Sequence, residues 1–328
     1  MSMRSEAFIL FHVFGLPVTC YALCLVVSLA AGYCLFFFRC RRMKIEENAA
    51  WACALFAVPL GLLGARLFYS ASLHQMYLEI GLEKIFTLWE GGYALWGAVG
   101  GAVLAAVFAG KKRRETARLL DALASAGALV IGLMRFAEYF SGEGIGDEVE
   151  LPFFCRFPFA VYDAEYEVWY WAVFVLEGLA AIAILFALLK KERPKGDTAR
   201  LFFILYGSCQ ILLESLRRDH YLRYLHVRIC QLTAILVIAA LMIGAILRWR
   251  RDKERRRMTG KAVALCCGAV LACSGLIVAL EFSIFGKIWI DLPVWAAYLM
   301  MAACCAVIGW ASGQVILRST ARENATAK

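Results

Sequence analysis

The sequence is poor in the features that mark a metalloprotein or a protein held together by disulfides. Its 13 cysteines include no C-x-x-C pair, and no His/Cys spacing typical of a metal site occurs. We therefore expect no metal and no other cofactor. Most of these cysteines, among them Cys20, Cys53 and Cys266, fall inside apolar segments. Cysteine in such a segment behaves as a small hydrophobic residue, so a disulfide framework is not expected.

Signals of other membrane-protein classes are missing as well. The alternation of apolar and polar residues typical of a membrane β-barrel is absent. The first apolar block lacks a basic segment before it and an A-x-A-like site after it, so we expect it to be retained rather than cleaved as a signal peptide. No inverted repeat typical of many transporters is found in the sequence.

Apolar sequence is what the chain has in abundance. It comprises 328 residues, 62% of them hydrophobic, and its mean hydropathy is +0.68. The apolar blocks run to about 18–25 residues, the length that a helix needs to cross a membrane. Backbone groups in lipid must be satisfied within the helix. The sequence therefore predicts an all-α fold, a polytopic helical membrane protein with about nine transmembrane helices. These are expected at roughly 15–38, 50–70, 91–110, 119–140, 167–190, 201–217, 230–248, 262–284 and 293–317.

The formal net charge of +9 is distributed in a way that orients the chain. Basic segments fall between alternate spans, and such segments remain in the cytoplasm. They lie at 39–44, 111–118, 190–195 and 248–257. We therefore expect the N-terminus outside and the C-terminus in the cytoplasm. Topology accounts for the positive charge, so no nucleic acid partner is expected.

One basic segment lies on the unexpected side of the membrane. The loop RRDHYLRYLHVR at 217–228 falls outside by the count of spans, although it is rich in arginine. Such a loop suggests an anionic ligand, for example a phospholipid headgroup. The alternative is an interfacial amphipathic segment whose arginines contact the leaflet nonspecifically.

Several charged side chains fall within spans, where charge is costly and marks a candidate functional site. Arg66, Arg135 and Arg217 lie near the outer ends of their spans. We expect them to converge with several carboxylates in one outward-opening cavity, where guanidinium groups would bind phosphate through paired donors. The alternative is that these charges form interhelical ion pairs that only hold the bundle together.

Glycines gather at the start of the third predicted span, in WEGGYALWGAVGG at 89–101. The stretch lacks the Lys-Ser/Thr of a phosphate-binding P-loop and follows no predicted strand. Small residues let helix backbones approach closely within a membrane. We therefore expect these glycines to serve close helix packing.

Six motifs occur in a fixed order between roughly residues 15 and 247: GARLFY, WEGGYALWGAVGG, GLMRFAEYFSGEGIG, LEGL, YGSCQILLESLRRD and CQLTA. Their order resembles the bacterial prolipoprotein diacylglyceryl transferase family. The resemblance implies transfer of the diacylglyceryl group of phosphatidylglycerol to the thiol of a lipobox cysteine, with glycerol phosphate as the leaving group. It also implies a bacterial cytoplasmic membrane as the location, and phosphatidylglycerol, a prelipoprotein lipobox peptide and membrane lipid as partners.

The resemblance, carried over residue by residue where the motifs match, implies two sets of site residues, to which Glu138 is added for its carboxylate. The catalytic residues would be Arg135, Glu138, Glu143 and Glu214. The residues that bind the lipid headgroup would be Arg66, Arg135, Tyr206, Arg217 and Gln231.

The chain departs from the family pattern at several of these positions. Trp96 stands where the family has a histidine, Glu138 where it has an asparagine, and Gln210 where it has an arginine. Arg218 replaces a proline. Tryptophan cannot take a proton and glutamine supplies no charge. A carboxylate would therefore have to accept the thiol proton; the candidates are Glu138, Glu143, Glu177 and Glu214.

The chain is expected to divide into two regions. Residues 1–250 would form a seven-helix membrane core like that of the family. Residues 251–328 would add a basic cytoplasmic loop, two further spans and a short cytoplasmic tail. Glu281 and Asp291 flank the outer connection of the added spans, which are expected to serve packing or partner binding.

Three functions are compatible with the sequence. The first is the transferase itself. The second is a diverged family member that keeps the lipid-binding bundle but has another acceptor or donor, or no activity. The third is a transporter or channel that uses the same buried charges for proton coupling.

Overall fold

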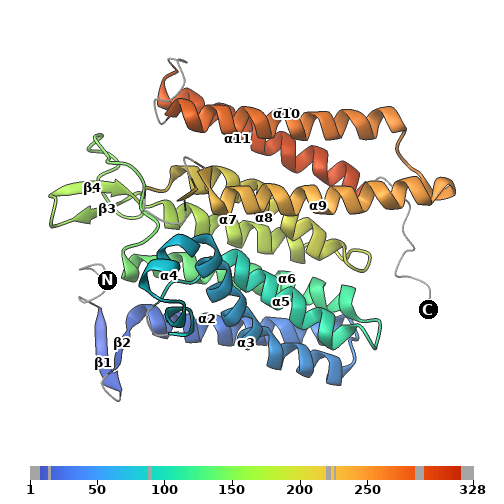
Figure 1. The fold of residues 1–328 in the computed structure, drawn as a ribbon, viewed down its shortest axis with the longest axis horizontal. Coiled ribbons are helices and arrows are strands. Elements are labelled where there is room, and N and C mark those ends of the chain that lie inside the picture. The colour runs from blue at the N-terminus through green and yellow to red at the C-terminus, as the bar shows by residue number, and fades with distance from the viewer. Residues whose placement is uncertain are drawn as a thin grey trace.

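The computed structural model describes residues 8–13, 16–87, 91–218, 223–224, 227–284 and 292–318. Within these residues nine apolar helices lie together, most of them along the long axis of the molecule (Figure 1). Seven are long and apolar enough to cross a membrane: α2 (Cys20–Arg42), α3 (Glu47–Ser72), α6 (Thr116–Ser141), α8 (Asp197–Leu216), α9 (Ile229–Arg251), α10 (Gly260–Ile284) and α11 (Val294–Gly313), the last continued by η4 (Gln314–Arg318). Two shorter apolar helices are α5 (Leu95–Gly110) and α7 (Val173–Leu189). The predicted polytopic all-α fold is confirmed.

Helix α2 begins at Cys20 rather than at 15, because Leu16–Thr19 form a strand. Two further helices also begin later than the sequence predicted. Helix α5 begins at Leu95 rather than at 91, because Gly91 and Gly92 have φ angles of 77° and 76°, which are incompatible with a right-handed helix. Helix α7 begins at Val173 rather than at 167, because the residues before it form a strand. Both helices are consequently shorter than a full span.

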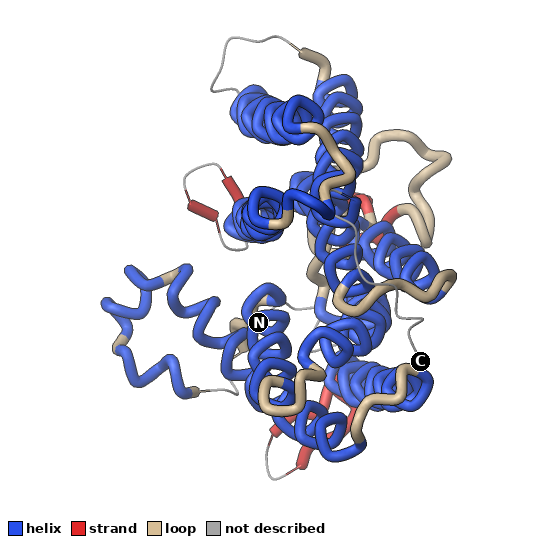
Figure 2. Tube along the Cα trace, turned by 90° about the vertical axis from the view of Figure 1, so that its right-hand side faces the viewer, coloured by secondary structure: helices blue, strands red, loops and turns tan. Residues whose placement is uncertain are grey.

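The described residues include three antiparallel hairpins that the sequence did not predict. The first precedes α2, and the other two lie between α6 and α7 and between α8 and α9. The hairpins pair β1 (Ile9–Val13) with β2 (Leu16–Thr19), β3 (Ala160–Asp163) with β4 (Val168–Trp171), and β5 (Arg223–Tyr224) with β6 (Val227–Arg228). The first two lie at the same end of the bundle as the short helix α4 (His74–Ile80) and the 3₁₀ turn η1 (Leu82–Phe86) (Figure 1). A view along the bundle shows the helices largely end-on and the strands toward its edge (Figure 2).

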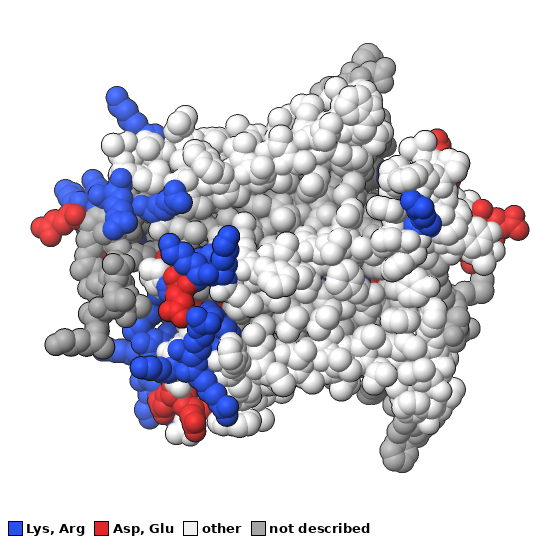
Figure 3. Space-filling view, turned by 180° about the vertical axis from the view of Figure 1, so that it is seen from behind, with Lys and Arg blue, Asp and Glu red and all other residues white. Residues whose placement is uncertain are grey.

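Lys and Arg gather at one end of the molecule, and the broad middle of the surface carries almost no charge (Figure 3). Helix α2 ends in Arg39, Arg41 and Arg42, and helix α9 ends in a similar basic turn. Large apolar side chains such as Leu55 of α3 and Phe108 of α5, each 70% exposed, lie on the surface of these helices. Exposure of this kind is costly in water and favourable in lipid. The chain is a multi-pass membrane protein.

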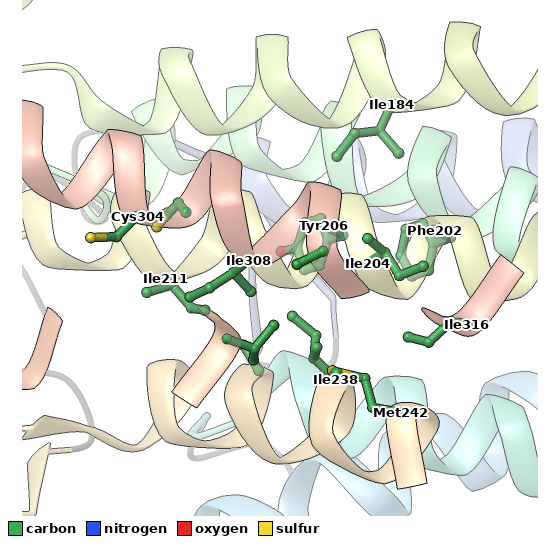
Figure 4. Close-up of a cluster of buried hydrophobic side chains, with 14 of the residues drawn as sticks. Ile184, Phe202, Ile204, Tyr206, Ile211, Ile238, Met242, Cys304, Ile308 and Ile316 are labelled. Atoms are coloured by element: carbon green, nitrogen blue, oxygen red, sulfur yellow. The ribbon is translucent and has the colours of Figure 1, made fainter. Parts of the chain in front are cut away.

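The largest apolar core unites the helices inside and outside the seven-span region. Ile184 of α7, Ile211 of α8 and Ile238 of α9 pack in the same cluster as Ile308 of α11 and Ile316 of η4 (Figure 4). Helix α11 therefore belongs to the packed bundle. A second core lies among α2, α3, α5 and α6.

Close packing of α3 on α5 depends on glycine. A Cβ atom at Gly97 would lie 2.6 Å from Cβ of Phe68 and would collide with the main chain of Gly64. Gly101 meets the main chain of Leu60 in the same way. The prediction that these glycines serve helix packing is confirmed at Gly97 and Gly101, whereas Gly100 faces open space.

A buried aspartate fixes the start of α8 against α6. Asp121 of α6 is fully buried and accepts hydrogen bonds from the main-chain N–H groups of Gly196 (2.6 Å) and Ala199 (2.8 Å). These groups belong to the first turn of α8, where N–H groups lack partners within the helix. The cap sets how α8 lies along α6, and both helices carry residues of the candidate site.

Candidate active site

The last turns of α6 place two ionisable side chains on one face. Arg135 and Glu138 are three residues apart and form an ion pair, as neighbours on a helix surface do. The helix ends at Gly142, whose φ of 75° is left-handed and whose N–H donates to the main-chain oxygen of Glu138 at 2.9 Å. At Gly144 a Cβ atom would collide with the Glu138 carboxylate and would lie 2.8 Å from Cβ of Phe174. These glycines therefore let the loop lie directly against Glu138.

Arg135 and Glu138 belong to a cluster of two arginines and two glutamates from three helices. Nη1 of Arg135 lies 3.2 Å from Oε2 of Glu177 on α7. Nη1 of Arg217, the residue that ends α8, lies 3.0 Å from the same oxygen and 3.4 Å from Oε2 of Glu138. The predicted convergence of Arg135, Glu138 and Arg217 is therefore present in the structure.

These four side chains are almost removed from solvent, with Glu177 only 2% exposed. Burial of a charge is costly unless an opposite charge accompanies it, and removal of one partner leaves the other uncompensated. Arg135 and Arg217 are thus already paired with carboxylates. A phosphate group can bind them only by displacing a carboxylate or by adding to the pairs.

A second polar group adjoins the first along α8. Gln210 donates to Oε2 of Glu214 at 2.7 Å, and Nη1 of Arg228 lies 3.3 Å from Oε1 of the same carboxylate. On α9, Gln231 donates to Oε1 of Glu281 of α10 at 2.7 Å. Sequence reasoning considered Arg228 only as part of the basic loop at 217–228 and placed Glu281 beside an outer connection. Both are buried members of this network.

Several buried polar atoms have no hydrogen-bond partner among the described residues. They include Nε1 of Trp96 and Oε1 of Glu177. The ring of Trp96 lies 6.1 Å from that of Tyr206, whose hydroxyl interacts with Arg135. Buried polar groups are usually paired, so this part of the bundle offers a donor and an acceptor to a polar ligand.

Arg66 lies in a different set of contacts from the other two arginines. Its guanidinium donates to main-chain oxygens of η1 and of the segment that joins η1 to α5. The oxygens in η1 belong to Lys84 and Ile85, and those in the segment belong to Thr87, Gly91 and Gly92. An arginine has five N–H donors, and each is accounted for by these bonds. The structure therefore brings Arg135 and Arg217 together and uses Arg66 to hold this segment in place.

Glu143 lies in the exposed part of the loop that follows α6. Its carboxylate acts electrostatically on Tyr21 of α2 and Tyr69 of α3. Tyr21 also lies in the field of Arg135 and Glu138. Sequence reasoning did not single out Tyr21, because a tyrosine at the end of a span is typical of the membrane interface.

The loop after α6 is anchored by the end of α8. The N–H of Arg218 donates to the main-chain oxygen of Ile145 at 2.8 Å, and Nη2 of Arg218 donates to Asp147 at 2.7 Å. The hydrogen bond with Asp147 raises the pKa of Arg218 above its ordinary value. A proline at 218 would lack the N–H, so this anchor depends on the arginine that departs from the family pattern.

The basic outer loop is described only in part. Residues 219–222 and 225–226 lie outside the described residues. Arg217 and Arg228, at its two ends, are buried and bonded to the network within the bundle. Within the described residues no group of three or more His, Cys, Asp or Glu side chains has the geometry to hold a metal ion.

Comparison with known proteins identifies relatives of this chain. A family model described as prolipoprotein diacylglyceryl transferase matches residues 8–247. A phosphatidylglycerol–prolipoprotein diacylglyceryl transferase of Streptococcus suis is 28% identical over 249 residues, which cover 72% of this chain and 90% of the relative. The protein of the same name from Streptococcus pneumoniae is 30% identical over 237 residues, or 70% of this chain and 89% of the relative. That from Tropheryma whipplei is 31% identical over 206 residues, or 58% and 75%.

Proposed function

Because the chain belongs to the prolipoprotein diacylglyceryl transferase family, we propose that it transfers the diacylglyceryl group of phosphatidylglycerol to the thiol of a lipobox cysteine in a prolipoprotein. A carbon–sulfur bond forms, and the bond from the same glycerol carbon to the phosphate oxygen breaks. Glycerol phosphate leaves with the electron pair of that bond, and the thiol proton passes to a base. The observation that carries the proposal is the buried cluster of Arg135 and Arg217 with two glutamates.

The two arginines are suited to the leaving group. Negative charge develops on the phosphate as the carbon–oxygen bond breaks, and guanidinium groups fixed in a site of low dielectric stabilise such charge strongly. Arg135 and Arg217 come from different helices, yet both contact Oε2 of Glu177. Their guanidinium groups are therefore held near one point, where the phosphate would lie.

A carboxylate has to serve as the base, because Trp96 cannot accept a proton. Attack by sulfur requires the thiolate. Glu138 is the candidate that the geometry favours, since it lies in the arginine cluster and against the loop at Gly144. Glu143 lies at the exposed side of the same loop, where a peptide substrate would approach from water. Glu214 is buried with its own partners.

The proposed orientation puts the site near the outer face of a bacterial cytoplasmic membrane. The basic ends of α2 and α9 would lie in the cytoplasm, according to the positive-inside rule. Arg135 and Arg217 lie near the C-terminal ends of α6 and α8, which would lie on the other side of the membrane from these basic ends. We further propose residues 1–250 as the catalytic core and 251–328 as a helix pair added to it, with its tail in the cytoplasm.

Transfer is tested with purified protein, phosphatidylglycerol labelled in its glycerol headgroup, and a lipobox peptide. Released glycerol phosphate is the readout. Arg135→Ala is expected to lower the rate by about 100-fold or more, because a buried guanidinium directed at the phosphate is lost. Arg200→Ala removes an arginine that pairs with Asp197 at the other end of the bundle and should retain the rate. Equal rates in the two variants would contradict the proposal.

One alternative function has a specific observation in its favour. Both arginines are engaged by carboxylates, and Trp96 replaces a residue able to exchange protons. A family member that binds the lipid without transferring it would show this arrangement. Lipid binding that depends on Arg135, without any release of glycerol phosphate, would favour this alternative. Family membership favours either function over a transporter.

A further inference from the structure

Glu214 keeps a counter-ion although the residue one turn before it on α8 is uncharged. Gln210 occupies the position where the family pattern has an arginine, and its amide donates to Oε2 of Glu214 at 2.7 Å. An amide supplies a hydrogen bond but no charge. The other carboxylate oxygen, Oε1, contacts Nη1 of Arg228 at 3.3 Å. The positive charge beside Glu214 thus comes from a different element of the chain.

The ion pair between Arg228 and Glu214 is buried, so the loss of either partner would be costly. The side chains of Arg228 and Glu214 are 4% and 5% exposed. A carboxylate at such a site is costly to keep without a cation, and removal of the cation leaves a buried uncompensated charge. The ion pair therefore constrains where the last turn of α8 lies relative to the start of α9, which follows Arg228 directly.

Arg228 also reaches the backbone of the residue that completes the arginine cluster. Its Nη2 donates to the main-chain oxygen of Arg217, the residue at the C-terminal end of α8. Carbonyl groups at the end of a helix lack partners within it, and a cation there is favoured by the helix dipole. The side chain of Arg217 then extends to Glu177 and Glu138.

From these contacts we propose that Arg228 is a positioning residue. It supplies the counter-ion for Glu214 that Gln210 cannot supply, and it fixes the backbone of Arg217 so that the guanidinium of Arg217 faces the headgroup phosphate. The inference rests on the proposed function for the identity of that phosphate. Arg228 itself bonds to Glu214 and to the main chain, and acts on the substrate through Arg217.

The test moves the positive charge beside Glu214 from position 228 to position 210. Arg228→Gln should lower kcat/KM for the lipid by about 100-fold, through both a lower kcat and weaker lipid binding, because Arg217 loses its fixed position. The double variant Arg228→Gln with Gln210→Arg restores a cation beside Glu214, and should recover activity to within about tenfold of the parent protein. Arg200→Gln, on the same helix α8, is the matched control and should keep the parent rate.

Lipid binding, which can be measured without any transfer reaction, tests this inference separately from the proposed function. Binding of phosphatidylglycerol by the full chain in nanodiscs, followed by native mass spectrometry, should weaken about tenfold or more in Arg228→Gln and recover in the double variant. Thermal denaturation identifies any variant that fails to fold. Absence of transfer by the parent protein would refute the proposed function. Comparison of lipid binding by the parent protein, Arg228→Gln and the double variant would still decide the role of Arg228. A folded Arg228→Gln variant that binds and reacts like the parent, or a folded double variant without recovery, would overturn the inference.

Discussion

Gln231 of α9 donates a hydrogen bond of 2.7 Å to Glu281 of α10. The same amide nitrogen donates to the main-chain oxygen of Ile211 on α8 at 2.9 Å. Helix α10 lies beyond the residues that match the family, so the added part of the chain places a carboxylate in the buried polar network. Ser215 of α8 also donates to the sulfur of Met301 on α11 at 3.8 Å. The added pair is joined to the core by polar contacts as well as by apolar packing.

Replacement of Glu281 by leucine should therefore destabilise the whole bundle. The substitution leaves an N–H of Gln231 without its acceptor in a buried site, which costs about 1–3 kcal/mol. Glu281→Gln keeps an acceptor oxygen at the same distance along the side chain and is the matched control. Thermal denaturation in detergent should give a lower Tm for Glu281→Leu than for Glu281→Gln. Equal values would mean that Glu281 contributes nothing through this bond.

Two glycines three residues apart on α5 provide a matched pair for the packing of α3. Gly97→Ala would push a methyl group into the main chain of Gly64, whereas Gly100→Ala meets nothing within 4 Å. Overpacking of this kind costs about 1–3 kcal/mol. Alanine also favours helix over glycine, so Gly100→Ala should be neutral or slightly stabilising. In the same detergent, Gly97→Ala should lower the Tm, and Gly100→Ala should leave it unchanged or raise it slightly. A Tm of Gly97→Ala equal to or above that of Gly100→Ala would contradict the close contact of α3 with α5.

Charged residues within apolar spans made much of the site visible in the sequence. A buried charge is costly, so its presence in a span indicates a partner. This reasoning brought Arg135, Glu138 and Arg217 together before the structure did. It did not predict the contacts of Arg66, because the depth of a side chain in the membrane does not say which way the side chain points. Arg66 lies at a span end as expected but bonds to main-chain oxygens.

The residues that the sequence did not reveal look ordinary in their local context. Arg228 belongs to a basic loop whose arginines could equally well contact the lipid leaflet nonspecifically. Its partner Glu214 is 14 residues away, on α8. The hairpins were missed for a related reason. Strands β3 and β4 are four residues each. Strand β4 falls inside the apolar block at 167–190, whose length predicted only a helix. Contacts that depend on how helices are arranged leave little trace in the local pattern.

Glu138 stands where the family pattern has an asparagine, and this difference gives a direct test of how the site handles negative charge. Its carboxylate pairs with both Arg135 and Arg217. Glu138→Asn removes the carboxylate and leaves Glu177 as their shared partner. A phosphate then competes with one carboxylate rather than two. Affinity for phosphatidylglycerol in nanodiscs should rise about tenfold, which corresponds to ~1.4 kcal/mol.

The same variant distinguishes a base from a competitor for the arginines. If Glu138 takes the thiol proton, Glu138→Asn should lower kcat while KM for the lipid falls, because an amide cannot accept the proton at neutral pH. Glu115→Gln, which breaks an ion pair with Arg118 on the same helix near its other end, should change neither quantity. Weaker lipid binding in Glu138→Asn would mean that the carboxylate holds Arg135 and Arg217 in place for the phosphate. In that case Glu177 alone would not be sufficient to keep the two guanidinium groups together.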